Sequence, residues 1–270
     1  MRGIQRGPIE DLRSHLRRRP MNGWPVAGLY GLLAASGLIA GAVAGLWLQM
    51  RHRVIGAVTA VGVGLLIAAA SLYLISGALE AVDATTAASG ALAGAASFSL
   101  ANLVLRRWSA EKRKRCGECV RQPTESGRPG SGLALAFGSL LDAVPEALII
   151  GSTVATGAEA LPSVALVAAF GFANFAESLS SATGMRDAGR SRLYVLLVWS
   201  GATLVTAGAA ILGFLLFTNG SVERGWLEAF AAGALIALVV ETMAPEAVAE
   251  QPGFSGLLAM LGFSALLLAL

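Results

Sequence analysis

The segment SGLIAGAVAG (residues 36–45) contains no charged residue, and six of its ten positions are glycine or alanine. It lies inside an apolar stretch, residues 26–49, that exceeds the ~20 residues a helix needs to cross a bilayer core. Small residues let the backbones of packed membrane helices approach closely. A similar segment, SGALAGAAS, occupies residues 89–97. Both segments predict tightly packed helices in a membrane.

The composition of the whole chain agrees with this prediction. Of 270 residues, 55% are hydrophobic and only 14% are charged, against about 25% charged residues in soluble domains. Eight apolar stretches have nearly spanning length: residues 26–49, 54–78, 87–105, 132–156, 161–184, 193–217, 226–248 and 254–270. We therefore predict an all-α, polytopic membrane protein with eight transmembrane helices. Its medium is the lipid bilayer, and we expect no nucleic-acid partner.

Charge divides the chain into four parts: a basic tail (1–25), three helices (26–105), a basic loop (106–131) and five helices (132–270). Lysine and arginine follow the first, third and fifth spans, whereas the connectors after the second and fourth spans are acidic. The positive-inside rule makes the odd connectors cytoplasmic and both termini external. The arginine-rich tail would itself prefer the inside, so we interpret it as a surface-lying or disordered arm. A plasma membrane of the bacterial type is the expected location.

Both cysteines lie in the basic loop, in the sequence CGEC (Cys116 to Cys119). The spacing suits a metal or a thiol redox pair, but one such pair is only half of a zinc site. Reduced thiols or weak metal capture are the favoured interpretations. Redox catalysis is the least favoured.

Acidic residues occur inside the apolar stretches, where an ionised carboxylate costs several kcal/mol unless something compensates it. The segment LLDAVPEALIIG (residues 140–151) contains Asp142 and Glu146, and the next span contains Asn174 and Glu177. Glu241 lies within the seventh span. No lysine, arginine or histidine accompanies them at that depth, so we expect protons, water or a metal ion to compensate their charge.

The spacing of these residues favours one shared site. Asp142 and Glu146 are separated by four positions, and Asn174 and Glu177 by three, so each pair projects from one helix face. Pro145 and the later pair Ala244–Pro245 predict helix breaks beside the acids. The alternative is packing, in which protonated carboxyls and Asn174 bond to neighbouring helices. The remaining acids, near span ends, are expected on solvated faces: Glu80, Asp83, Glu159 and Glu246. The serines after Glu177 are expected to pack or to bond to the backbone: Ser178, Ser180 and Ser181.

These residues resemble the ZIP (ZRT/IRT-like) family of divalent-metal transporters. Helix four of that family commonly carries His-Asn-x-Pro-Glu-Gly, and DAVPEA (residues 142–147) retains the Pro-Glu core. A similar box in helix five is matched by ANFAES (residues 173–178), and the acid before a proline in helix seven by VETMAP (residues 240–245). The resemblance covers nearly the whole chain after the tail. It implies eight helices, external termini, a long cytoplasmic loop, import and a homodimer.

The chain departs from the family pattern at its histidines, which are replaced by Asp142 and Ala173. Ala143 stands for the asparagine of helix four, and Ala147 and Ser178 stand for the motif glycines. Imidazole suits zinc, whereas carboxylate and amide oxygens suit harder ions. Zinc selectivity is therefore open.

We predict a secondary transporter of divalent cations (Zn, Fe, Mn or Cd as substrate), which is not an enzyme. The metal site would comprise Asp142, Glu146, Asn174, Glu177 and Glu241. The alternatives are a non-transporting metal sensor and, less favoured, an intramembrane acid-base enzyme. The particular metal, the direction, proton coupling and the oligomeric state stay undetermined by the sequence.

Overall fold

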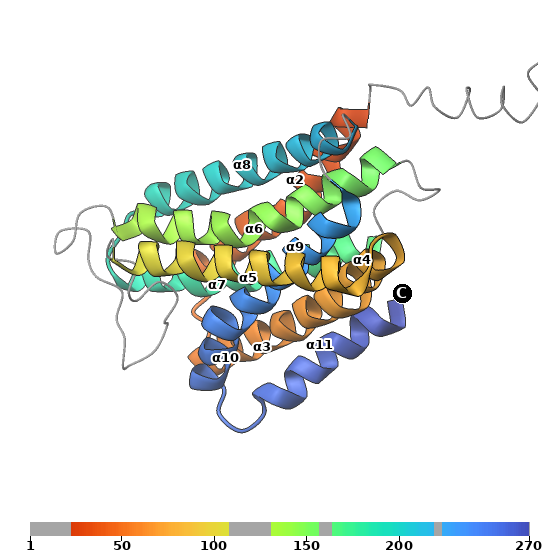
Figure 1. Cartoon of the computed structure of the whole chain (residues 1–270). Helices are drawn as coiled ribbons and strands as arrows, with labels where there is room; N and C mark the ends of the chain where they lie inside the picture. Colours follow the sequence, from red (N-terminus) through yellow and green to blue (C-terminus); the bar gives the residue numbers. More distant parts are fainter. Residues whose placement is uncertain (1–22, 108–130, 157–163, 219–222, 270) are drawn as a thin grey trace, which may run out of the picture.

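The structure, a computed structural model, describes residues 23–107, 131–156, 164–218 and 223–269 (Figure 1). Regular secondary structure in these ranges is helical throughout. The helices are α2 (Trp24–Trp47), α3 (His52–Ala68), the π-helix η2 (Ala69–Ile75), α4 (Ser76–Ala81), α5 (Ala84–Arg107), α6 (Ser131–Thr156), α7 (Val164–Asp187), α8 (Arg192–Thr218), α9 (Arg224–Leu238), the π-helix η4 (Val239–Met243), α10 (Ala244–Glu250) and α11 (Ser255–Ala269).

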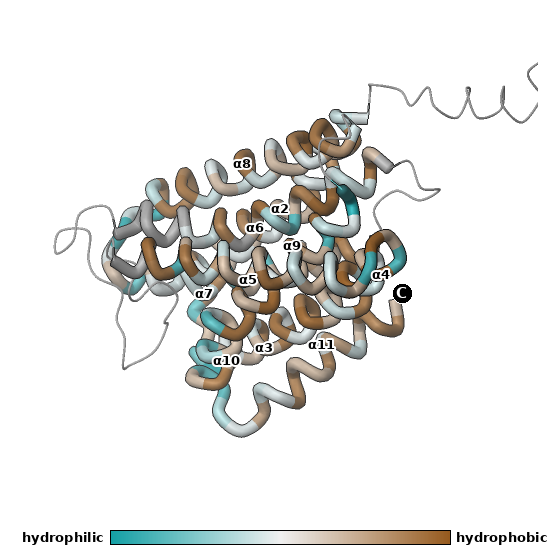
Figure 2. Tube along the Cα trace, in the orientation of Figure 1, coloured by the Kyte–Doolittle hydropathy of each residue, from teal (hydrophilic) through white to brown (hydrophobic). Residues whose placement is uncertain are grey.

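Seven of the resulting helical spans are long and apolar enough to cross a membrane. Two are composite, because α3, η2 and α4 follow one another without a break, as do α9, η4 and α10. The eighth predicted span corresponds to α11, which is apolar but shorter. The prediction of a polytopic all-α membrane protein is confirmed, while the count of eight crossings stays a prediction. Figure 2 shows hydrophobic residues along much of these helices.

The helices pack in two groups. In the first group α2 lies along both α7 and α8, and α6 lies along α8. In the second group α5 lies along α9, and α3 lies along α11 and the composite span α9–α10. The groups meet chiefly where α3 packs on α7 and where α6 packs on α9 (Figure 1). Any polar residue at these two contacts therefore lies between the groups.

Glycines bring the backbones of α2 and α7 into direct contact. A Cβ atom added to Gly37, Gly41 or Gly45 would lie closer than 3.0 Å to a backbone oxygen of α7. These glycines recur every four residues, which places them on one face of α2. The segment that predicts close packing in the sequence is thus the contact face of α2.

Three other helix pairs make the same contact from both sides. In each pair, a glycine on either helix lies where a Cβ would come closer than 3.0 Å to a carbonyl oxygen of the partner helix. The pairs are α3 with α11 (Gly64 and Gly262), α6 with α8 (Gly151 and Gly213) and α5 with α9 (Gly94 and Gly233). Small residues on both faces allow this approach, as expected for membrane helices.

Replacing Gly41 by alanine should destabilise the protein by about 1–3 kcal/mol, because the new methyl group overpacks the α2–α7 contact. Gly208→Ala on α8 is the matched control, since nothing lies within 4 Å of its added Cβ. The control should be neutral or stabilising by up to ~1 kcal/mol. Thermal unfolding in detergent measures both variants. Equal melting temperatures for the two would contradict close packing at Gly41.

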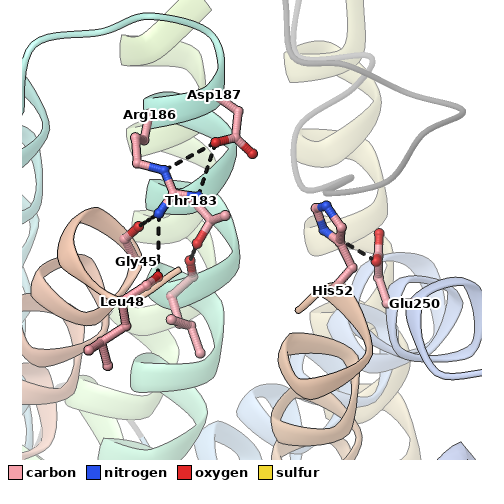
Figure 3. A network of polar contacts seen from close by, with 8 residues as sticks. Gly45, Leu48, His52, Thr183, Arg186, Asp187 and Glu250 are labelled. Atoms are coloured by element: carbon pink, nitrogen blue, oxygen red, sulfur yellow. Dashed lines mark hydrogen bonds and ion pairs between the residues drawn. The ribbon is translucent and has the colours of Figure 1, made fainter. Parts of the chain in front are cut away.

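Arginine side chains of α7 and α8 contact the end of α2. Arg186, near the end of α7, donates from Nη1 to the carbonyl oxygens of Gly45 (2.8 Å) and Leu48 (3.3 Å) at the end of α2 (Figure 3). Arg192, which begins α8, lies over the ring of Trp47 at 5.5 Å. We call this side of the bundle, where Arg186 and Arg192 contact the end of α2, the arginine-rich end. Such donors satisfy the last carbonyls of a helix and complement its dipole.

Asp83 precedes α5 and caps it. Its carboxylate accepts hydrogen bonds from the backbone N–H groups of Thr85 (3.1 Å) and Thr86 (3.2 Å) and from both threonine hydroxyls. These bonds, chiefly from the Thr85 and Thr86 side chains, hold the pKa of the Asp83 carboxyl well below its usual range. Asp83 and Glu80 are exposed, as predicted for acids near span ends.

The cap makes stability depend on pH in a defined direction. The pKa of the Asp83 carboxyl is lower in the folded protein than in the unfolded chain, where it is about 3.9. The ionised carboxyl therefore stabilises the folded state fully above about pH 3.9, and this stabilisation is lost as pH falls toward the folded pKa. Asp83→Asn keeps a capping side chain that does not titrate. The stability difference between wild type and Asp83→Asn should be constant from about pH 7 to 5 and narrow below about pH 4. Thermal unfolding across this range measures it, and a difference that stays constant to pH 3 contradicts the role of Asp83.

Candidate functional site

A buried carboxylate and a buried amide meet where α2, α6 and α7 come together. Glu146 on α6 and Asn174 on α7 are 3% and 2% exposed. Asn174 Nδ2 lies 3.4 Å from Glu146 Oε2 and 3.2 Å from the carbonyl oxygen of Ala34 on α2. The structure thus joins two residues that the sequence places on different spans, in the middle of the first helix group.

Pro145 precedes Glu146 without ending the helix. The helix α6 continues from Ser131 to Thr156 with Pro145 inside it. Because proline has no N–H, the carbonyl of Leu141 loses its usual intrahelical donor. The predicted break at this position is therefore wrong, but one backbone carbonyl next to the site is left without its helical N–H donor.

Glu177 lies one turn beyond Asn174 on α7 and is also buried. Ser178 follows Glu177, and its hydroxyl donates to the carbonyl of Asn174 (2.9 Å) and lies 3.3 Å from the carbonyl of Gly37 on α2. Ser178 thus packs and bonds to backbone, as predicted. Asp142 belongs to α6, but its side chain lies outside the described residues, as do Glu159 and both cysteines, Cys116 and Cys119.

Glu241 has different neighbours from Glu146. It is exposed and lies in the π-helix η4 of the second helix group. Its carboxylate accepts hydrogen bonds from the Ser99 hydroxyl and from Asn102 Nδ2 (2.8 Å), both on α5. Glu241 therefore bonds to α5, and Glu146 bonds to α7.

The break predicted at Pro245 takes the form of a π-helical turn. The π-helix η4 ends at Met243, and α10 begins at Ala244 with Pro245 in its first turn. Single π-helical turns often mark functional sites in α-helices. The other π-helix, η2, contains no proline, and nothing in the sequence predicted it.

The prediction of a solvated face for Glu246 is wrong. Glu246 is 5% exposed and accepts a hydrogen bond from the Ser180 hydroxyl, which was expected to pack or to bond to the backbone. The reason is tertiary, because α10 packs against α3 and thereby turns the end of its span inward. The repeated dipeptide Pro-Glu, at residues 145–146 and 245–246, is the sequence signal that could have identified Glu246.

Other buried polar residues, Asn102 and Glu228 among them, went unnoticed in the sequence. Asn102 is buried beside Glu241, and Glu228 is buried near the start of α9. Glu228 Oε1 accepts a hydrogen bond from Arg224 Nε at 2.7 Å. The spacing of four residues between Arg224 and Glu228 is the signal that predicts such a pair on a helix.

Within the described ranges, no three side chains of histidine, cysteine, aspartate or glutamate lie close enough together to hold a metal ion. The Glu146 carboxylate and the Ala34 carbonyl oxygen instead meet at the amide nitrogen of Asn174. Carboxylate and carbonyl oxygens bind hard divalent cations, and a carboxylate also binds a proton.

Comparison of the chain with protein-family models and with curated proteins found no match. The functional argument accordingly rests on the buried polar groups and on the arrangement of the helices around them.

Asn174→Ala should lower stability by about 1 kcal/mol, because it removes an interhelical hydrogen bond and leaves Glu146 with one donor fewer. Thr206→Val is the matched control, since Thr206 is equally buried but donates to Ala202 on its own helix (2.9 Å). Thermal unfolding in detergent compares the two. If Thr206→Val is as destabilising as Asn174→Ala, the bond between α6 and α7 contributes nothing measurable.

Proposed function

We propose that this chain is a secondary transporter of divalent cations, with zinc, iron and manganese as the class of substrate. The buried contact between Glu146 and Asn174 supports this proposal most directly. A carboxylate at membrane depth is retained when it serves an ion or proton pathway.

Alternating access would use the division of the helices into two groups. Glu146 and Asn174 belong to the first group, and Glu241 to the second. A rocking of one group against the other would change which oxygens surround the cation, as in other transporters with midplane sites. The cation would bind between Glu146 and Glu177, with Asp142 and Asn174 completing the shell. Glu241 would assist or take protons.

The proposed ligands of the cation, carboxylate and amide groups, support a metal selectivity broader than zinc alone. Carboxylate and amide oxygens favour harder ions than imidazole does, although zinc and iron also bind such sites. We propose that the chain is a divergent ZIP-like carrier that has exchanged its motif histidines for oxygen ligands. A homodimer in the plasma membrane is part of the same proposal.

Metal flux into proteoliposomes tests the transport proposal. Wild type should transport at least one metal from a panel of Mn, Fe, Zn, Cd and Mg, and Glu146→Ala/Glu177→Ala should reduce this flux at least about a hundredfold, because two charged ligands are lost. Glu80→Gln/Glu223→Gln is the matched control, since both of these acids are exposed at span ends. It should keep wild-type flux.

Absence of flux for every metal in correctly inserted protein would refute a carrier. Binding without flux, measured by calorimetry, would then indicate the metal sensor. Equal flux in wild type and in Glu146→Ala/Glu177→Ala would exclude these residues from the pathway.

A further inference from the structure

A hydrogen bond between buried side chains connects the two helix groups. Ser180 on α7 is 2% exposed, and Glu246 on α10 is 5% exposed. The Ser180 hydroxyl donates to Glu246 Oε1. Because α7 belongs to the first group and α10 to the second, this bond crosses the interface at which the groups would move.

The bond lies between the candidate site and the arginine-rich end. Ser180 follows Asn174 by six residues, or about 9 Å along the axis of α7. Arg186 follows Ser180 by another six residues and bonds the end of α2. A cation leaving Asn174 in this direction along α7 would therefore pass Glu177 and then Ser180.

Further polar side chains lie beyond the Ser180–Glu246 bond, toward the arginine-rich end. Glu250, one turn after Glu246 on α10, is buried, and one of its carboxylate oxygens lies 3.7 Å from His52 Nδ1 on α3 (Figure 3). Glu246 and Glu250 share one helix face because they are four residues apart. Oxygen groups thus extend from Glu146 to the arginine-rich end.

We propose that the Ser180–Glu246 hydrogen bond is a latch that closes the route between the Glu146–Asn174 site and the arginine-rich end, and that Glu246 binds the cation when the latch opens. The proposal rests on the transport function proposed above. A carboxylate binds a divalent cation more strongly than it binds a neutral hydroxyl. The arriving cation therefore competes with Ser180 for Glu246. When Glu246 binds the cation, its bond to Ser180 breaks and α7 separates from α10.

Thiol accessibility tests the latch independently of metal flux. A cysteine at Ala176, which is buried and packs near Gly62 of α3, reports on the interface between the groups. The background is Cys116→Ser/Cys119→Ser in proteoliposomes, with a small charged thiol reagent. Ser180→Ala should accelerate modification at least about tenfold, because a hydrogen bond to a charged acceptor contributes about a decade in an equilibrium constant.

Two variants separate the latch from simple helix packing. Thr183→Val on the same helix removes a buried hydroxyl that donates to the carbonyl of Leu179 within α7 (2.8 Å). It should change the modification rate less than about twofold. Glu246→Gln keeps an oxygen acceptor for Ser180 but loses the charge. It should accelerate modification less than Ser180→Ala does, because a weaker neutral hydrogen bond remains. It should also reduce metal flux at least about tenfold, because the route then lacks a charged ligand.

Equal modification rates in Ser180→Ala and Thr183→Val would overturn the latch, and wild-type flux in Glu246→Gln would overturn the role of Glu246. These failures differ from failure of the transport proposal, in which wild type itself moves no metal while the thiol reagent still reports on the latch.

Discussion

The backbone contact between α2 and α7 at Gly37, Gly41 and Gly45 is the constraint on which the candidate site depends. Asn174 lies on the α7 face that this contact brings close to α2, and its amide lies 3.2 Å from the carbonyl of Ala34. A methyl group at any of the three glycines would separate the helices and lengthen that bond. Backbone proximity therefore positions an amide that in turn faces the carboxylate of Glu146.

Three membrane-depth acids share one arrangement, in which a neutral donor from another helix holds the carboxylate. Asn174 on α7 faces Glu146, Asn102 on α5 faces Glu241, and Ser180 on α7 faces Glu246. Glu228 differs, because Arg224 bonds its carboxylate. A neutral donor orients a carboxylate without placing a positive charge beside it, whereas an arginine forms an ion pair with it.

Much of the fold was predictable because the bilayer imposes simple requirements. Uninterrupted apolar length identified the spans that appear as α2 to α11, since backbone polar groups in lipid must be satisfied within a helix. Glu146 and Asn174 were both predicted as members of one site, and the structure brings these two into contact. The contact between Glu246 and Ser180 was not predicted. A position near the end of a span indicates depth along the helix and says nothing about the neighbouring helix.

The sequence by itself determined that this is a polytopic helical membrane protein, which segments are long and apolar enough to span, and which acids interrupt them. Hydrophobic length and local spacing decide these properties one helix at a time. Only the tertiary structure decided that the helices form two groups, that Glu241 pairs with α5, and that Glu246 faces Ser180 across the interface. These outcomes depend on which small-residue faces pack together, and in a chain with glycines on most of its helices many pairings satisfy the same local pattern.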